Sequence, residues 1–339
     1  MTVLSVLDLS PIIEGGDAAQ ALNNSLDLAR QTERMGYNRY WVAEHHNMRG
    51  IASAATSVVI GHIAQGTERI RVGAGGIMLP NHSPLQIAEQ FGTLEALYPG
   101  RIDLGLGRAP GTDGITAQAL RRTLHSDPNK FPQDVLELKQ FLADPEPNQR
   151  VQAVPGYGAK VPLYILGSSL FGAQLAAILG LPFAFASHFA PQAMMQAIEI
   201  YRREFSPSDQ LAEPYVILGY NVCAADTEAE ALLLRSSGLQ AFLNLRFGNP
   251  GPLPAPKANL EASLTSDQQA VMAQISSAAA VGTPEQVRDQ IFDFVAQTAA
   301  DELIITSQIF DHAARVRSYE LTYAAVHEAP PQAAAMSGS

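Results

Sequence analysis

The sequence is poor in cysteine, in long apolar runs and in positive charge, and each scarcity excludes a class of protein. Cys223 is the single cysteine among 339 residues, so no internal disulfide can form, which fits a reducing cytoplasm. No run of about 18 apolar residues occurs, so a membrane span is not expected. The first residues, MTVLSVLDLS, lack the basic and apolar regions of a signal peptide. We therefore expect a cytoplasmic protein.

Acidic residues outnumber basic ones, 33 to 22, which gives a net charge of -11. A chain of this charge is repelled by phosphate backbones, so nucleic acid is not an expected partner. The HxH and HExxH patterns of zinc enzymes are also missing, so no metal site is expected. Hydrophobic residues make up 47% of the chain, which is enough for a large core.

Eight short apolar runs alternate with helix-like segments along the chain. The predicted strands are Val3–Leu9, Tyr40–Ala43, Ile70–Ile77, Arg101–Gly107, Val161–Leu166, Phe183–Ser187, Tyr215–Ala224 and Leu303–Thr306. Continuous apolar runs are typical of parallel strands that are buried on both faces. The eightfold repeat predicts an α/β fold, a single (β/α)8 or TIM barrel with inserted loops, over residues 1–328. The tail 329–339 is expected to be disordered.

Two long loops interrupt the predicted alternation. Asp144–Lys160 precedes the fifth strand, and Gly248–Gln268 lies between the seventh and the eighth. Long barrel loops are often lids over a site. We therefore expect Gly248–Gln268 to cover the barrel mouth.

Polar and glycine-rich residues follow four successive predicted strands. They are Glu44-His45-His46, Gly75-Gly76, Gly107-Arg108 and Gly167-Ser168-Ser169. An α/β barrel carries its active site at the carboxyl ends of the strands. These residues are therefore expected on one rim, together with Ser187-His188 after the sixth strand.

The histidines and Arg108 have both functional and structural interpretations. Adjacent side chains of an extended segment point to opposite sides, so at most one of His45 and His46 faces the barrel mouth. Imidazole suits acid–base work, and a structural hydrogen bond is the alternative. Arg108 suits an anion or an aromatic ring, or else a surface salt bridge.

The glycines and serines are ambiguous in the same way. Gly75 and Gly76 indicate a bulge or close approach to a ligand, or a tight turn. Ser168 and Ser169 precede a helix, where hydroxyls and free N–H groups hold phosphate or simply cap the helix. The segment GLGRAPG is not a dinucleotide motif, because Pro110 occupies the third glycine position.

Three segments carry a family resemblance: WVAEHHNMRGIASAA, GGIMLPNHSPLQIAEQFGTLEALYPGRIDLGLGRAPGTD and ILGSSLFGAQLAAILGLPFAFASHFAP. They resemble the bacterial luciferase-like flavin monooxygenases, and most of all the single-subunit, alkanal monooxygenase-like branch, over nearly the whole chain. The resemblance implies a barrel that binds reduced FMN. Molecular oxygen then forms a C4a-peroxyflavin, which attacks an aldehyde or another small organic substrate.

The resemblance also implies roles for particular residues. The catalytic histidine of the family matches His45, and His46 is a supporting candidate. The flavin-binding positions match Gly75 and Gly76, joined by a cis peptide bond in the family, Arg108, and the phosphate-binding Ser168, Ser169 and Gly172.

The chain departs from luciferase at two positions of this set. Gly107 stands where luciferase has a reactive cysteine, and Ser168 stands where it has a carboxylate. No light emission is therefore predicted.

The resemblance further implies a homodimer, with the helices Ala52–Gln65 and Gln86–Tyr98 as the candidate interface. The sequence shows no separate nicotinamide-binding domain, so a separate flavin reductase is expected to supply reduced FMN. Three alternatives stay open. They are a deazaflavin-dependent hydride-transfer oxidoreductase, a flavin-binding protein without turnover, and a metal-dependent barrel hydrolase.

Overall fold

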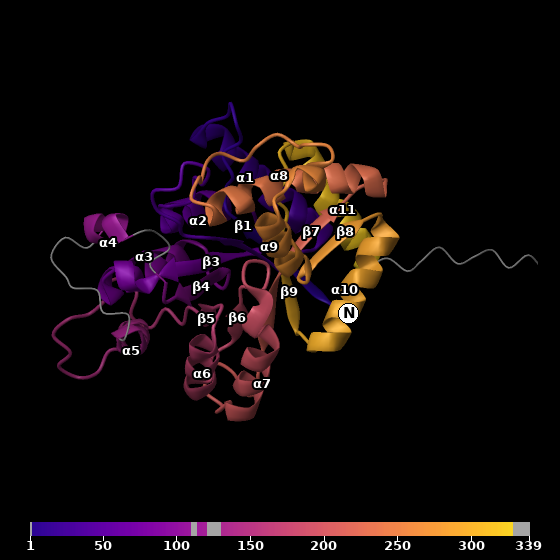
Figure 1. Cartoon of the computed structure of the whole chain (residues 1–339). Helices are drawn as coiled ribbons and strands as arrows, with labels where there is room; N and C mark the ends of the chain where they lie inside the picture. The colour runs from indigo at the N-terminus through magenta and orange to yellow at the C-terminus, as the bar shows by residue number, and fades with distance from the viewer. Residues whose placement is uncertain (1, 110–113, 121–129, 328–339) are drawn as a thin grey trace, which may run out of the picture.

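Nine parallel strands form one closed sheet in the computed structural model, which describes residues 2–109, 114–120 and 130–327. The strands are β1 (Val3–Asp8), β2 (Arg39–Val42), β3 (Arg71–Met78), β4 (Ile102–Gly107), β5 (Leu163–Gly167), β6 (Phe183–Phe185), β7 (Val216–Ala224), β8 (Ala279–Gly282) and β9 (Glu302–Thr306). Strands β1 to β7 pair in chain order, and β9 closes the ring by pairing with both β7 and β1. The predicted (β/α)8 barrel is therefore confirmed (Figure 1).

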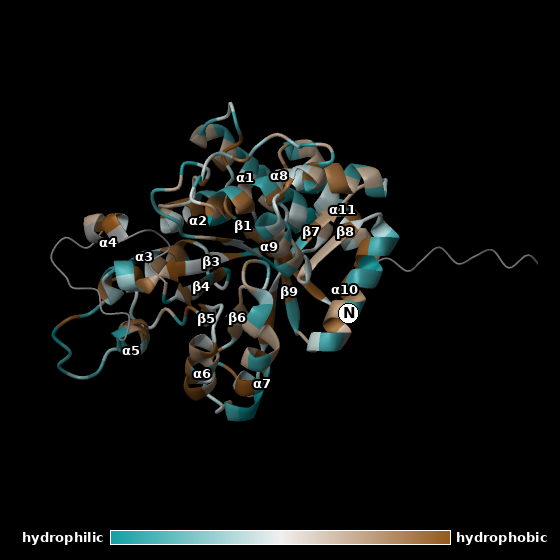
Figure 2. Cartoon of the chain, viewed as in Figure 1, coloured by the Kyte–Doolittle hydropathy of each residue, from teal (hydrophilic) through white to brown (hydrophobic). Residues whose placement is uncertain are grey.

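Helices surround the barrel (Figure 1). They are α1 (Ala18–Met35), α2 (Thr56–Gln65), α3 (Pro84–Leu97), α4 (Gly114–Leu120), α5 (Phe131–Leu142), α6 (Leu170–Leu179), α7 (Met194–Glu204), α8 (Glu228–Arg246), α9 (Ser266–Ser276), α10 (Pro284–Thr298) and α11 (His312–His327). Figure 2 shows both hydrophilic and hydrophobic residues on outer helices such as α7 and α10, as expected for helices with one buried face. No helix in the described ranges has the length and apolar character needed to cross a bilayer.

The strand β8 is missing from the sequence prediction. Its four residues, AAVG, are too few and too small to stand out as an apolar run. It pairs with Asn221–Ala224 of β7, beyond the point where β6 stops pairing at Leu218. The strand forms because β7 is longer than β6 and leaves a free edge at the barrel rim.

The predicted lid loop Gly248–Gln268 contains more structure than the sequence indicates. It includes a short 3-10 turn at Leu260–Ser263, and α9 begins at Ser266. Its first part is fixed to the segment after β1, because Leu253 N donates to Ile12 O at 2.8 Å and Glu14 N donates to Leu253 O at 2.9 Å. The loop is thus anchored across the barrel mouth.

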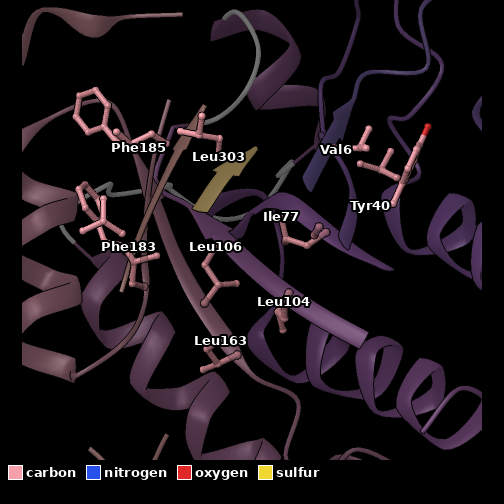
Figure 3. Close-up of a cluster of buried hydrophobic side chains, with 14 of the residues drawn as sticks. Val6, Tyr40, Ile77, Leu104, Leu106, Leu163, Phe183, Phe185 and Leu303 are labelled. Atoms are coloured by element: carbon pink, nitrogen blue, oxygen red, sulfur yellow. The ribbon is translucent and has the colours of Figure 1, made fainter. Parts of the chain in front are cut away.

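The alternation of strand residues separates two cores. Outward side chains pack under the helices, and Figure 3 shows members of this cluster from different strands, including Val6, Tyr40, Leu104 and Phe183. Inward side chains form a separate cluster inside the barrel. It comprises Leu7, Trp41, Ala43, Tyr164, Ala184, Ile217 and Ile304.

A buried ion network closes the amino-terminal end of the barrel interior. Arg39 donates to Asp103 at 2.8 Å and to Glu302 at 2.7 Å, and Arg71 donates to Asp103 at 2.6 Å. These residues come from β2, β4, β9 and β3, near the start of each strand. Because this end is filled, any site inside the barrel must open at the carboxyl ends.

Candidate functional site

The carboxyl ends of the strands enclose a cavity of about 800 Å³. Small residues occupy inward positions here, where barrels usually carry bulky ones. They include Ala43, Gly75, Gly107 and Ala186. The volume lies within the roughly 300–1,000 Å³ typical of small-molecule sites. The absence of large side chains at these positions therefore leaves space for the cavity.

His45 and His188 face this cavity, and the Nδ1 atom of each is buried without a hydrogen-bond partner. Burial lowers the pKa of His45 to about 4, with Glu44 opposing the shift and His46 adding to it. Burial, together with the nearby His45, lowers the pKa of His188 to about 4 as well. Both imidazoles are therefore neutral at physiological pH and have a ring nitrogen available to a ligand.

Alternate residues of a strand point into the barrel, and this explains the position of each histidine. His45 follows the inward residues Trp41 and Ala43 at intervals of two, and His188 follows Ala184 and Ala186 in the same way. His188 fits because Gly219 has no side chain, since a Cβ at that position would overlap the imidazole ring. From the sequence, His188 is expected on the rim, but no role for it is predicted.

His46 lies outside the set of residues that line the cavity. Its Nε2 is 2.7 Å from Glu44 Oε1, and His82 Nε2 is 2.8 Å from the same oxygen. Although burial alone would raise the pKa of Glu44, hydrogen bonds from His82, from His46 and from the Met78 amide hold it below its ordinary value. An ionised carboxylate only accepts, so both imidazoles donate to it.

The donor atoms of Glu44, His46 and His82 lie within 4.8 Å of one another, which is also the spacing of a possible metal site. Distances of 2.7 and 2.8 Å are, however, those of hydrogen bonds. None of the three residues lines the cavity. The three residues therefore form a hydrogen-bonded cluster outside the cavity lining.

The peptide bond Gly75–Gly76 is cis, as the family resemblance implies. The register between β3 and β4 shifts between Ala74 and Ile77, so the two glycines form a bulge. A Cβ on Gly76 would approach Gly105 O to 2.6 Å, and a Cβ on Gly75 would approach Leu7 Cδ1 to 2.8 Å. Glycine is thus required by the neighbouring strands, and both residues line the cavity.

Arg108 follows β4 and lines the same cavity. Its guanidinium carbon lies 4.3 Å from the centre of the Phe171 ring. No ion pair in the described ranges includes Arg108, so the salt-bridge alternative finds no support there. Stacking on Phe171 holds the guanidinium in place and leaves its N–H groups for an anion.

Ser168, Ser169 and Gly172 also line the cavity, at the amino terminus of α6. Ser169 is the N-cap residue by position, but its side chain makes no capping hydrogen bond. The simple capping alternative is therefore incomplete. Two hydroxyls and the free N–H groups of the first turn form a site suited to phosphate, next to Arg108.

The cavity thus joins two kinds of chemistry. Its lining offers a guanidinium and a helix amino terminus for an anion, and it also offers two neutral imidazoles and a cis diglycine. Thr306 also lines the cavity, and its Oγ1 is buried without a partner. Unpartnered buried polar atoms are costly unless a ligand pairs with them. A large polar molecule with a phosphate group fits these residues.

A family model described as luciferase-like monooxygenase matches residues 3–302 of the chain. The chain belongs to this family. A luciferase-like monooxygenase of Escherichia coli is 54% identical over 317 residues, which cover 94% of this chain and 95% of that protein. The N-acetyl-S-alkylcysteine monooxygenase of Bacillus subtilis is 34% identical, with 96% and 98% of the two chains covered.

Several solved structures share the fold. Apo-MsnO8 is 35% identical, covers 97% of this chain and all of its own, and superposes with a TM-score of 0.85. The oxygenating constituent of 3,6-diketocamphane monooxygenase from Pseudomonas putida, solved with FMN, is 17% identical and covers 94% and 96% of the chains, with a TM-score of 0.71. An F420-dependent secondary alcohol dehydrogenase is 15% identical, covers 96% and 99%, and has a TM-score of 0.70.

Proposed function

We propose that this luciferase-like chain is an FMN-dependent monooxygenase, which uses reduced FMN and O2 to oxidise an aldehyde or another small organic substrate. One observation carries the proposal: a single cavity combines a phosphate-type cradle with a neutral His45 beside the cis Gly75–Gly76 bond. When bound, reduced FMN supplies the two electrons that activate O2. The residues of the chain would bind the flavin, move protons and exclude water.

Binding and orientation come from β3, β4 and α6. Arg108 and the first turn of α6 would hold the phosphate through charge-assisted hydrogen bonds. The flat surface of Gly75 and Gly76 would lie against the ring, because no side chain projects from either residue. The cradle follows β4 and β5, and His45 after β2 lines the same cavity.

Proton transfer would belong to His45. Its buried Nδ1 has no partner in the protein, and its pKa of about 4 keeps the ring neutral. A neutral imidazole accepts a proton at one nitrogen and donates from the other. Such a group can move a proton to or from reacting oxygen atoms at neutral pH.

Apolar residues would keep water away from the reaction. Leu9, Ile51, Phe189 and Leu245 line the cavity, and Leu253 of the anchored loop covers it from the other side. Exclusion of water strengthens electrostatic interactions and prevents side reactions. A separate flavin reductase would deliver reduced FMN into this space.

Anaerobic titration with photoreduced FMN, followed by ¹⁸O2 and a panel of aldehydes and thioethers, tests the proposal. We expect binding of reduced FMN and transfer of one labelled oxygen atom to a product. NADH with FMN should give no turnover until a flavin reductase is added. Selective binding of F420 with hydride transfer would favour the deazaflavin alternative. Flavin binding without altered oxygen reactivity would favour a binding protein.

A further inference from the structure

The cavity wall carries positive charge, although the chain as a whole carries a net charge of -11. Arg108, Arg235 and Arg246 line the cavity, whereas no Asp, Glu or Lys of the described ranges does. The proposed FMN phosphate accounts for Arg108 alone. The other two guanidinium groups lie on α8, which follows β7, away from the cradle after β4 and β5. They indicate a second anionic group.

Arg235 is the better placed of the two. Its Nη2 donates to Ser276 Oγ at 2.6 Å, and within the described ranges no ion pair includes it. Burial lowers the pKa of Arg235, although Cys223 and Glu261 oppose the shift. A guanidinium carries five N–H donors, and Ser276 accepts from one nitrogen of Arg235. Since Arg235 lines the cavity, its guanidinium can also donate to a ligand there.

One face of α8 connects the two arginines. Arg235, Leu239, Phe242 and Arg246 all line the cavity, at helical spacings of three to four residues. About three turns, roughly 16 Å, separate the first from the last. Arg246 lies over the rings of Phe189 and Phe242, at 4.8 and 5.3 Å, at the exposed end of the helix. The wall therefore has an apolar centre and a charge at each end.

A second polar group lies on the same side of the barrel. Thr306 Oγ1 is buried without a partner, and Thr306 pairs in register with Asn221. Cys223, which interacts with Arg235, lies two residues beyond Asn221 on the same inward side of β7. Burial raises the pKa of the Cys223 thiol to about 12, so the thiol stays neutral. A neutral thiol does not take the place of an anion beside the Arg235 guanidinium.

We propose that the substrate of this site is an organic carboxylate, that Arg235 binds its carboxylate group, and that its apolar body lies along Leu239 and Phe242. The planar guanidinium fork matches a carboxylate in two parallel hydrogen bonds. The inference rests on the proposed function, and it narrows the substrate to organic acids.

Calorimetric titration with octanoate and its neutral analogue octanamide tests the inference, on the full chain with and without FMN. The wild type should bind octanoate at least about ten-fold more tightly than octanamide, as expected for a paired charge. Arg235→Gln should abolish this preference, and Arg235→Lys should restore part of it. Equal affinities in the wild type, or an unchanged preference in Arg235→Gln, would overturn the inference.

Two matched variants separate recognition from structural support. Ser276→Ala removes the hydrogen-bond partner of Arg235 and keeps its charge, so the preference for octanoate should persist. Arg288→Gln alters an arginine that pairs with Asp289 outside the cavity, and should change nothing. Loss of the preference in Ser276→Ala would assign Arg235 a structural role instead. Weakened FMN binding in Arg235→Gln would place it in the flavin site. Carboxylate binding is measured without flavin, so failure of the proposed function would be seen separately.

Discussion

At the scale of single residues, His45 has the clearest expected effect. Replacement by Ala should lower the rate of product formation by about 100-fold or more, which is the usual contribution of a general acid–base group. Binding of reduced FMN should change much less, because His45 is not part of the cradle formed by Arg108 and the first turn of α6. Steady-state kinetics and anaerobic titration measure the two effects. His62→Ala, on the exposed face of α2, is the control. Full activity in His45→Ala would remove this residue from the mechanism.

The neutral histidines also predict a dependence of stability on pH. Each has a pKa of about 4 when folded and about 6.5 when unfolded, so below pH 6.5 the unfolded chain binds protons that the folded chain does not. Stability should therefore fall between pH 7.5 and 5, by about 2 kcal/mol for each histidine. His45→Gln should reduce this loss of stability, because it removes one of the two neutral histidines. The neighbouring titratable groups Glu44, His46 and His188 remain in the variant. Urea denaturation at both pH values measures it, and an identical loss in the variant would contradict the assignment.

Arg108→Gln should weaken FMN binding by about 10- to 100-fold, because it removes a charge-assisted contact of about 1.5–3 kcal/mol. Riboflavin, which lacks the phosphate, should bind the variant and the wild type equally. Fluorescence quenching of each flavin measures the affinities. Arg69→Gln, at an exposed position beside Glu68, serves as the control. An equal loss for riboflavin would place Arg108 at the ring and not at the phosphate.

The sequence predicts some residues of this site and misses others, depending on where each residue lies relative to a strand. Residues directly after a recognisable strand, such as His45, Arg108 and Ser169, are found by position. Thr306 and Arg235 are not, since an inward threonine within a strand and a helix arginine look ordinary in the sequence. Arg235 becomes informative only when folding brings it to a cavity without acidic residues.

At the scale of elements, strands with apolar runs are predicted well, and β8 is not. Its four residues form a strand only because β7 extends beyond β6, which is a tertiary cause. The ion network inside the barrel cannot be predicted from the sequence for the same reason. Arg39 and Glu302 lie 263 positions apart in the sequence and meet only when the sheet closes.

This network predicts a large cost for losing its central charge. Arg39→Met leaves Glu302 buried without a cationic partner and Asp103 with Arg71 alone, so the free energy of unfolding should fall by about 3–5 kcal/mol. Chemical denaturation measures the change. The control is Arg203→Met. The ion pairs of Arg203 with Glu199 and Glu204 are exposed to solvent, so their loss should cost little stability. Similar costs in both variants would mean that the buried network contributes no special stability.

At the scale of the whole molecule, the barrel separates stability from function along its axis. The amino-terminal end holds buried ion pairs, the middle holds an apolar layer, and the carboxyl end holds the cavity. The eightfold repeat in the sequence predicts only the carboxyl-end site of this division, because α/β barrels carry their sites at the carboxyl ends of the strands. Where substrate enters depends on loops, whose contacts no periodicity encodes.

The outer surface carries the last expectation, a homodimer formed through α2 and α3. The two helices are adjacent, since Tyr98 after α3 donates to Gly61 O of α2 at 3.3 Å. They expose Val58 and Leu97, at 71% and 64% of their full areas, on the predicted interface. We propose that a second copy covers these side chains, so that Val58→Glu with Leu97→Glu should give monomers in light scattering. Ile178→Glu, equally exposed at 67% but on α6, should leave the dimer intact. Dissociation by the α6 variant alone would move the interface to that helix, because a charge disrupts only the apolar face that is buried.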